Sequence, residues 1–275
     1  MLGFKLSASS FQLNIPMCLI VFAWRPNQAL PLIVAANRDE FHARPSLPLA
    51  VWEDAPHVIA GRDLQAGGTW MGIGAAGRFA ALTNIRAPGA PLGARSRGEL
   101  PERYLRGQLS PQAYLTELTG RLQQYSGFNL LVGDTRELWY LNSAMGAPEQ
   151  LLPGIYGLSN AALDTPWPKL VRARSALQEC LCTPEAEKLL QLLSDPQPAA
   201  DAELPSTGVP YEWEKRLSSV FIASAEYGTR ASTVLIRRAD GSTELIERCF
   251  GPAGRLGESR INLPPLSQVS GPMHV

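Results

Sequence analysis

The chain has 275 residues, and its 25 basic and 25 acidic residues cancel to a formal net charge of zero. This length is enough for a domain that buries its own core without disulfides or metals. Residues of both charge signs are interspersed, so the sequence predicts no binding surface for nucleic acid or an anionic membrane. No apolar run approaches the roughly 20 residues that a membrane span needs.

The first 16 residues differ in character from the rest of the chain. They contain one lysine and a broken hydrophobic pattern, which is a weak match to a secretory signal. Met17 as the true initiator is the favoured interpretation of this extension. We therefore expect residues 1–16 to lie outside the mature fold, a single domain over residues 17–250, and a loose Gly- and Pro-rich tail over residues 251–275.

Two short apolar runs, residues 17–24 and 32–41, are separated by a turn that contains Pro26 and Asn27. This pattern predicts a β-hairpin. In an antiparallel pair, the start of the first strand lies beside the end of the second. We therefore expect Cys18 to lie near the charged tetrad at residues 37–40, as a nucleophile beside a charge cluster.

Three loop signals come after this hairpin. The prolines within residues 44–48 predict an extended loop that leads away from the tetrad. Residues 67–84 predict a second hairpin, and they lack the motif and the following helix of a phosphate-binding loop. Residues 85–98 are rich in Pro, Gly, Ala and Arg, which predicts a mobile surface loop, with a lid over a site as the alternative.

The rest of the chain mixes helix and strand signals. Helices are predicted over residues 110–123, 166–181 and 183–194. Strands are predicted over residues 128–132, 138–141, 155–159, 219–223, 233–237 and 244–249. Adjacent hairpins interrupted by helical blocks favour an α+β fold with mainly antiparallel sheet over a Rossmann-type alternation.

Cysteine and histidine positions argue against a metal site. The chain has four cysteines, namely Cys18, Cys180, Cys182 and Cys249. They lack the paired spacing of a zinc site, which favours reduced thiols in a cytoplasmic protein. The three histidines, His42, His57 and His274, have no partners at metal or triad spacing. The sequence therefore predicts no metal.

A series of short motifs begins with Met-Cys at residues 17–18 and continues with Ala-Asn-Arg-Asp-Glu-Phe at residues 36–41. Further motifs stand at residues 67–72 (GGTWMG), 80–84 (AALTN), 97–100 (RGEL), 127–130 (GFNL), 156–160 (YGLSN), 165–169 (TPWPK) and 227–230 (YGTR). Together they resemble the NRDE family, also called the transport and Golgi organisation protein family. That family is placed with the N-terminal-nucleophile (Ntn) hydrolases, near the penicillin V acylases and bile salt hydrolases. The resemblance implies a four-layer αββα sandwich.

The resemblance also implies that Cys18 is the nucleophile. Taken alone, a cysteine is most often a small buried hydrophobe. Cys18 follows a Met and is small enough for initiator removal, which would leave a thiol and an α-amine on one residue. Such an amine, with a reference pKa of about 7.7 to 8.0, can accept the thiol proton near neutral pH. A chain that keeps its leader has an amide where this base should be.

Similarity to the Ntn acylases suggests roles for five more residues. Asp39 would hold the α-amine, and Arg38 would contact substrate or balance charge, although this tetrad is tighter than the acylase spacing. Asn84 and Asn160 match asparagines that stabilise the oxyanion, and Arg230 matches a late arginine that binds substrate. From the residues alone, turn-forming asparagines, an Arg38–Asp39 surface ion pair and a surface strand arginine are the alternatives.

The sequence therefore predicts a cytoplasmic amidohydrolase that acts on a small acyl amide through Cys18 without a cofactor. Two alternatives stay open. One is a non-covalent haem carrier, since family members have been linked to haem trafficking and no motif for covalent haem is present. The other is a catalytically retired scaffold that serves interactions.

Overall fold

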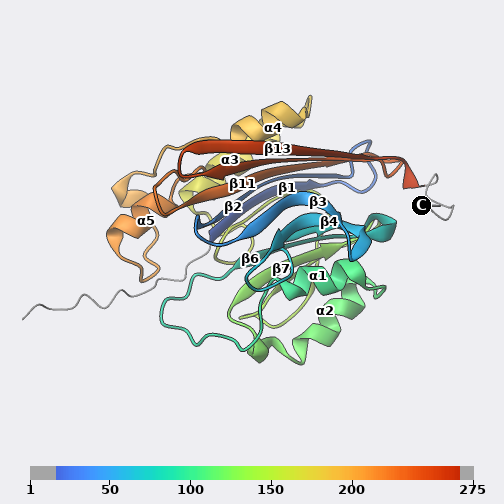
Figure 1. The fold of residues 1–275 in the computed structure, drawn as a ribbon, viewed down its shortest axis with the longest axis horizontal. Coiled ribbons are helices and arrows are strands. Elements are labelled where there is room, and N and C mark those ends of the chain that lie inside the picture. Colours follow the sequence, from blue (N-terminus) through green and yellow to red (C-terminus); the bar gives the residue numbers. More distant parts are fainter. Residues whose placement is uncertain (1–16, 267–275) are drawn as a thin grey trace, which may run out of the picture.

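The structure, a computed structural model, describes residues 17–266, so the expectation for residues 1–16 lies outside the described residues. Two β-sheets pack face to face, and helices cover the outer face of each (Figure 1). From top to bottom of Figure 1 the layers are helix, sheet, sheet and helix. The predicted α+β class and the αββα arrangement are therefore confirmed.

The upper sheet has six strands in the order β10-β1-β2-β11-β12-β13. Their bounds are Met17–Trp24 (β1), Leu32–Phe41 (β2), Gly154–Leu158 (β10), Tyr227–Arg237 (β11), Thr243–Gly251 (β12) and Gly254–Leu263 (β13). The predicted hairpin is present as β1 and β2. Its register pairs Cys18 with Arg38, as expected from the sequence.

The lower sheet has seven strands in chain order, from β3 to β9. Their bounds are Ser46–Trp52 (β3), Ala55–Asp63 (β4), Met71–Ile73 (β5), Phe79–Asn84 (β6), Phe128–Gly133 (β7), Leu138–Asn142 (β8) and Glu149–Gln150 (β9). All of its strand pairs are antiparallel, since each strand turns back beside the previous one. The second predicted hairpin is β5 with β6.

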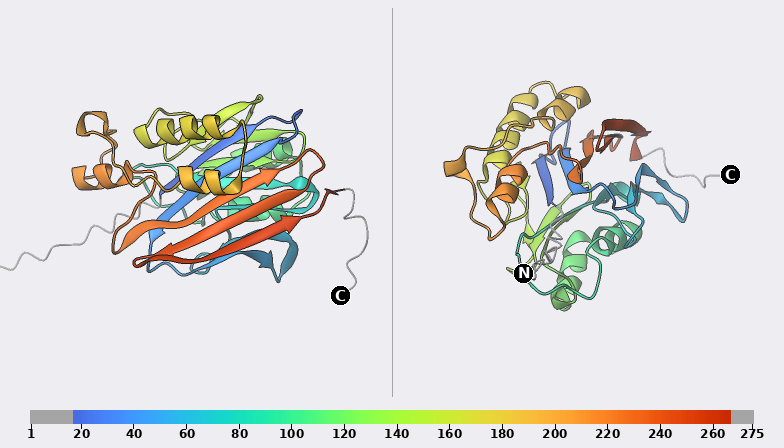
Figure 2. Two further views of the ribbon diagram at one scale, coloured as in Figure 1. Left: turned by 90° about the horizontal axis from the view of Figure 1, so that it is seen from above. Right: turned by 60° about the vertical axis from the view of Figure 1, so that its left-hand side comes forward.

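The helices are α1 (Glu99–Arg106), α2 (Pro111–Thr119), α3 (Pro168–Cys180), α4 (Ala186–Leu192) and α5 (Tyr211–Leu217). Helix α2 begins at the predicted Ser110 cap, whose hydroxyl accepts a hydrogen bond from the Ala113 N–H at 3.2 Å. Helices α3 and α4 lie over the upper sheet, and α1 and α2 lie under the lower one (Figures 1 and 2). Neither α1 nor α5 was predicted from the sequence.

Strand β1 supplies side chains to two different cores. Ile20, Phe22 and Trp24 are buried between the sheets, whereas Leu19 and Val21 pack against α3 and α4. This division follows from the two-residue period of a strand. Because Cys18 lies two residues before Ile20, the same period directs its side chain toward the space between the sheets.

The prediction of a loop over residues 44–48 that leads away from the tetrad is wrong from Ser46 onward. Strand β3 begins at Ser46 and pairs with β4 at the edge of the lower sheet. The pairing register shifts between Leu47 and Ala50, the interval that contains Pro48. An edge strand with an irregular register tolerates a proline, because a backbone N–H is not needed there.

The loose tail predicted over residues 251–275 is also wrong in part, because residues 254–263 form strand β13. Gly254, at a φ of +107°, closes the turn from β12, and β13 then pairs along the whole of β12. Most β13 side chains are exposed, so backbone pairing orders this strand without an apolar pattern in its sequence. The remainder, residues 267–275, lies outside the described residues.

The strand predicted over residues 219–223 is absent. Its backbone groups instead bind neighbouring loops and side chains. The Val220 carbonyl accepts a hydrogen bond from Asn37 Nδ2 at 2.8 Å, and the Phe221 N–H donates to the Asp195 carbonyl at 2.8 Å. The segment therefore has partners for its polar groups without joining a sheet.

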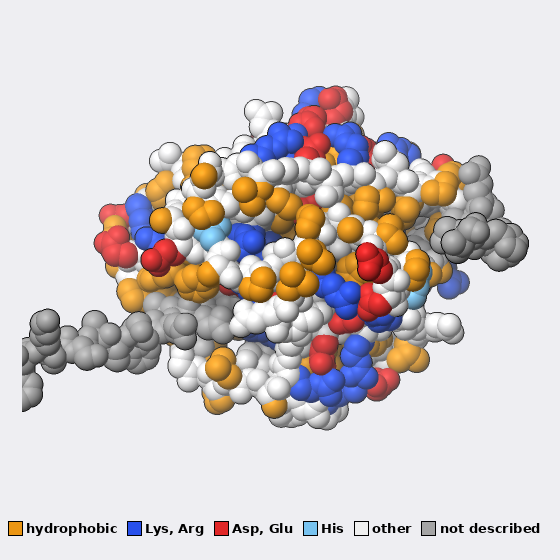
Figure 3. All heavy atoms as spheres, viewed as in Figure 1, with side chains coloured by type: hydrophobic (Ala, Val, Ile, Leu, Met, Phe, Trp, Pro, Cys, Tyr) orange, Lys and Arg blue, Asp and Glu red, His pale blue; other side chains and the backbone are white. Residues whose placement is uncertain are grey.

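Within residues 17–266, no helix has both the length and the apolar character needed to cross a bilayer. The face of the molecule seen in Figure 3 carries acidic and basic side chains next to one another. That face presents no broad field of one charge sign, in keeping with the zero net charge of the chain.

Candidate functional site

A pocket of about 680 Å³ is lined by residues of both sheets and of the loop before α1. Cys18, Arg38 and Glu40 reach it from the β1–β2 hairpin, and residues 92–98 form part of its wall. This volume lies in the range of sites that bind small molecules, about 300 to 1,000 Å³. The pocket therefore brings the predicted nucleophile to a space that can hold a ligand.

Cys18 is fixed through both of its backbone polar atoms. Its N–H donates to Asn160 Oδ1 at 3.3 Å, and its carbonyl accepts a hydrogen bond from Ser159 Oγ at 3.0 Å. The residue is only 6% exposed. Two adjacent residues that come directly after β10 thus hold the start of β1.

Burial, together with the nearby Asp39 carboxylate, raises the pKa of the Cys18 thiol to about 12, and Arg38 opposes this rise. In the chain that retains Met17, the Cys18 nitrogen belongs to a peptide bond and cannot accept a proton. The thiol of that chain therefore stays protonated near neutral pH, and a thiol is a far weaker nucleophile than a thiolate.

Asp39 lies on the opposite face of β2 from Arg38 and is the register partner of Met17. Its Oδ1 accepts a hydrogen bond from Thr229 Oγ1 at 2.7 Å, whereas its buried Oδ2 has no hydrogen-bond partner among the described residues. Burial raises the pKa of Asp39 to about 6, and Lys169 partly offsets this effect. One carboxylate oxygen is thus left for a further donor.

Lys169, which was not predicted from the sequence, lies in the first turn of α3 and is 1% exposed. Its Nζ has no hydrogen-bond partner within residues 17–266, and burial lowers its pKa to about 8 against the opposing charge of Asp39. The motif at residues 165–169 contains this lysine, but its sequence gives no sign that the side chain points inward. A buried lysine near a buried aspartate is visible only in the fold.

The two predicted asparagines lie together beside Cys18. Asn160 Nδ2 donates to the backbone carbonyl of Asn84 at 2.8 Å, while its Oδ1 accepts from the Cys18 N–H. Asn84 is among the residues that line the pocket. Because the Asn160 amide donates to a backbone carbonyl, this geometry favours a role in holding the Cys18 nitrogen over its predicted oxyanion role.

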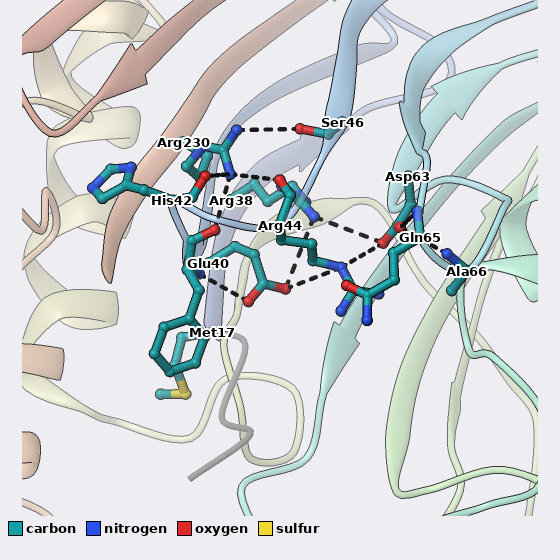
Figure 4. A network of polar contacts seen from close by, with 12 residues as sticks. Met17, Arg38, Glu40, His42, Arg44, Ser46, Asp63, Gln65, Ala66 and Arg230 are labelled. Carbon is teal, nitrogen blue, oxygen red and sulfur yellow. Dashed lines mark hydrogen bonds and ion pairs between the residues drawn. The ribbon is translucent and has the colours of Figure 1, made fainter. Parts of the chain in front are cut away.

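Arg230 binds the end of β2 and the loop after it. Its Nη1 donates to the carbonyl oxygens of Phe41 at 2.9 Å, His42 at 3.2 Å and Arg44 at 2.9 Å (Figure 4). The guanidinium thus holds residues 41–44 in place at the rim of the pocket. The geometry of these bonds favours a positioning role over the predicted contact with substrate.

The charged tetrad is divided between two faces of β2. Asn37 points toward the helices and donates to the Leu193 and Val220 carbonyls, whereas Arg38 and Glu40 line the pocket. Figure 4 shows these two side chains together with Arg44 and Asp63. Arg44 Nε lies 2.7 Å from Asp63 Oδ2, and Arg38 Nη2 lies 3.9 Å from carboxylate oxygens of both Glu40 and Asp63. Arg38 is therefore only loosely paired.

No group of three or more His, Cys, Asp or Glu side chains within residues 17–266 is arranged to hold a metal ion. His42 lies 3.2 Å from the Ser224 carbonyl through its Nε2, and His274 is outside the described part of the chain. The described site thus consists of a thiol, carboxylates, amides and guanidinium groups.

Two solved structures are similar to parts of the chain. One is a Caenorhabditis elegans ortholog of N-acylethanolamine-hydrolyzing acid amidase, with a TM-score of 0.44 and 14% identity over 90% of this chain and 100% of the other. The second is a mutant conjugated bile acid hydrolase from Clostridium perfringens, with a TM-score of 0.48 and 8% identity over 90% of this chain and 94% of the other. Likenesses this distant say nothing about activity.

Sequence relatives are much nearer. The chain is 34% identical to the Mus musculus Transport and Golgi organization 2 homolog over 255 residues, which cover 84% of this chain and 92% of the relative. The Homo sapiens homolog gives the same identity and coverage, and the Drosophila melanogaster protein is 29% identical over 259 residues. The family profile described as Transport and Golgi organisation 2 matches residues 17–252. The chain therefore belongs to the Transport and Golgi organisation 2 family.

Proposed function

We propose that the chain beginning at Cys18 is a cytoplasmic Ntn-type amidohydrolase that cleaves an amide or related acyl bond of a small molecule. One observation carries this proposal. The Cys18 side chain lines the pocket, while its backbone nitrogen lies 3.3 Å from Asn160 Oδ1. An α-amine freed at this nitrogen would have its own thiol beside it and a hydrogen-bond acceptor to orient it.

The chemistry of such a residue takes two steps. The α-amine accepts the thiol proton, and the thiolate forms a C–S bond with the substrate carbonyl carbon. The ammonium then returns a proton to the leaving amine as the C–N bond breaks. In the second step, water hydrolyses the thioester, which releases the acid and restores the thiol.

Removal of Met17 would also free space around Asp39. Met17 is fully buried, donates its N–H to Tyr227 Oη at 3.1 Å and pairs in register with Asp39. Once Met17 is absent, Asp39 Oδ2 is left for the α-ammonium, which supports the role predicted for this carboxylate. In the same proposal Asn84 lines the pocket at the oxyanion, and Arg38 balances charge beside the thiolate.

Intact-mass spectrometry of the untagged protein from its native host tests the start of the chain. We expect a dominant mass that begins at Cys18, because only a free α-amine there gives the thiol its base. Cys18→Ala should then abolish labelling by a thiol-reactive acyl probe. Cys180→Ala and Cys249→Ala should leave labelling nearly unchanged, since burial raises the pKa of both thiols.

A mass that retains residues 1–16 would refute the N-terminal nucleophile. A parallel titration with haem tests the carrier function that the family resemblance also implies. A saturable change in haem absorbance, together with no turnover in a screen of acyl amides, would replace the hydrolase proposal with non-covalent haem binding.

A further inference from the structure

Arginines are the most frequent charged residues around the pocket. The six that line it are Arg38, Arg44, Arg62, Arg95, Arg97 and Arg230. Four of them lie within 4.0 Å of a carboxylate, and Arg230 binds three backbone carbonyls. Arg97 has no carboxylate within 4.0 Å among residues 17–266, and its Nη1 donates to the Gly127 carbonyl at 3.0 Å. Arg230 likewise has no carboxylate within 4.0 Å among these residues, but it has three carbonyl partners where Arg97 has one.

The backbone at Arg97 is held in place by two glycine motifs. The Thr69 N–H donates to the carbonyl of Gly98 at 3.0 Å, so the GGTWMG segment lies against the RGEL segment. Gly68 has a φ of +75°, and a Cβ there would lie 2.3 Å from the Gly98 carbonyl oxygen. Only glycine fits this close approach. The two motifs therefore fix the position from which Arg97 extends.

Arg97 and the reacting thiol line the same pocket. Burial lowers its pKa to about 10, and the charges of Cys18 and Glu40 oppose that decrease while Arg44 adds to it. At neutral pH the guanidinium is therefore still charged. A partly buried cation without an acidic partner is unfavourable unless an anion or water completes its hydrogen bonds.

We propose that Arg97 binds an anionic group of the substrate, a carboxylate or a phosphate, while the acyl carbon lies at Cys18. This inference rests on the proposed function of the same pocket. The guanidinium fork matches both oxyanions, and one bond to Gly127 leaves further N–H groups for a ligand. A neutral substrate of the same shape would lose this contact.

Two alkylating reagents of similar size test the anion site directly, since iodoacetate is anionic and iodoacetamide is neutral. Both would be applied to the chain expressed with Met17 as initiator, in which Cys180, Cys182 and Cys249 are replaced by Ala. The measured quantity is the rate of Cys18 alkylation by iodoacetate divided by the rate with iodoacetamide. Changes in the reactivity of the thiolate affect both rates and cancel in this ratio. We expect Arg97→Gln to lower this ratio about tenfold.

Arg95→Gln is the matched control, because Arg95 lines the same pocket but lies 2.7 Å from Glu99. Its ratio should change less than about twofold. Equal ratios in the Arg97→Gln variant and the parent would overturn the inference. Protection from iodoacetamide by acetate or by inorganic phosphate, compared in the parent, distinguishes a carboxylate site from a phosphate site.

These outcomes separate the two proposals. If the ratio of alkylation rates depends on Arg97 but the chain hydrolyses no amide, the anion site is supported and the hydrolase proposal is refuted. If Cys18 reacts with neither reagent, its role as a nucleophile is refuted. The anion site is then tested by the change in melting temperature of the Cys18→Ala chain on adding octanoate or octanamide. A larger shift with octanoate that Arg97→Gln abolishes supports the site, and equal shifts refute it.

Discussion

At the scale of single residues, the pair formed by Asp39 and Lys169 shows how the fold perturbs ionisable groups. Each places a charge-bearing atom in the interior without a hydrogen-bond partner among the described residues. Burial raises the pKa of the acid to about 6 and lowers that of the base to about 8, and each charge partly offsets the burial of the other. The ionised form of each group is therefore stabilised in part by the charge of the other.

The lysine gives a prediction about stability and pH. The pKa of Lys169 is about 8 when folded, below its ordinary value of 10.5. Between these values the unfolded chain binds more protons, so this residue makes the free energy of unfolding rise with pH. Lys169→Met should remove that contribution. Urea unfolding at several pH values from about pH 8 to pH 10 measures how steeply the free energy of unfolding rises with pH. This slope should be smaller in Lys169→Met than in the parent.

Lys188→Met is the control, because Lys188 is exposed on α4. Its slope should match that of the parent chain. The same slope in Lys169→Met and Lys188→Met would mean that Lys169 titrates in the folded chain as it does in water.

At the scale of elements, the loop over residues 85–98 is anchored at both ends. At its start, Arg86 Nη1 lies 2.5 Å from Glu214 Oε2 on α5, and its guanidinium lies over the Trp167 ring at 4.5 Å from the centroid. At its end, the Gly98 carbonyl accepts the Thr69 N–H. The middle of the loop, residues 89–92, is exposed. Any movement of this pocket wall is therefore expected in the middle of the loop and not at its ends.

The anchor at Arg86 gives a second prediction. The side chains of Arg86 and Glu214 are 2% and 6% exposed, so Arg86→Met leaves a buried carboxylate without its cation. We expect a loss of about 3 to 5 kcal/mol in the free energy of unfolding, measured with urea. Arg95→Met, which breaks the more exposed pair with Glu99, should cost at most about 1 kcal/mol.

Arg86→Met combined with Glu214→Leu should recover most of the loss, since no unpaired charge then remains buried. A double variant that is no more stable than Arg86→Met would show that the ion pair itself is not what anchors the loop.

At the scale of the whole molecule, the two sheets share one apolar core. Phe22 is fully buried in it and stacks on Tyr156 with 5.2 Å between the ring centroids. This core also includes Ile59, Met71 and Phe79 of the lower sheet. The pocket is lined by both sheets, so the site depends on how this core holds them together.

Phe22→Ala tests that dependence. A large cavity between the sheets should cost about 3 to 5 kcal/mol, with unfolding still a single transition by fluorescence and circular dichroism. Leu152→Ala is the control, because Leu152 is 75% exposed, and it should change stability by less than about 0.5 kcal/mol. Two separate transitions in the parent chain would contradict a shared core.

The sequence by itself determined the local part of this protein. Two apolar runs and the turn between them predicted the β1–β2 hairpin, and antiparallel pairing predicted that Cys18 lies near the tetrad at residues 37–40, where its register partner is Arg38. Ordered motifs predicted the family and the αββα layers. These predictions succeeded because a hairpin needs only neighbouring residues and a motif is read directly from the chain.

Only the tertiary structure decided the surroundings of the thiol. Lys169 on α3 interacts with the charge of Asp39 on β2 because α3 packs on the upper sheet. Arg97 lines the same pocket as Cys18 because two glycine segments meet. Strand β13 is ordered by the free edge of β12 and not by its own pattern. Each of these contacts joins segments that are distant in the chain or lack an apolar pattern, so their spacing and hydropathy give no local signal for them.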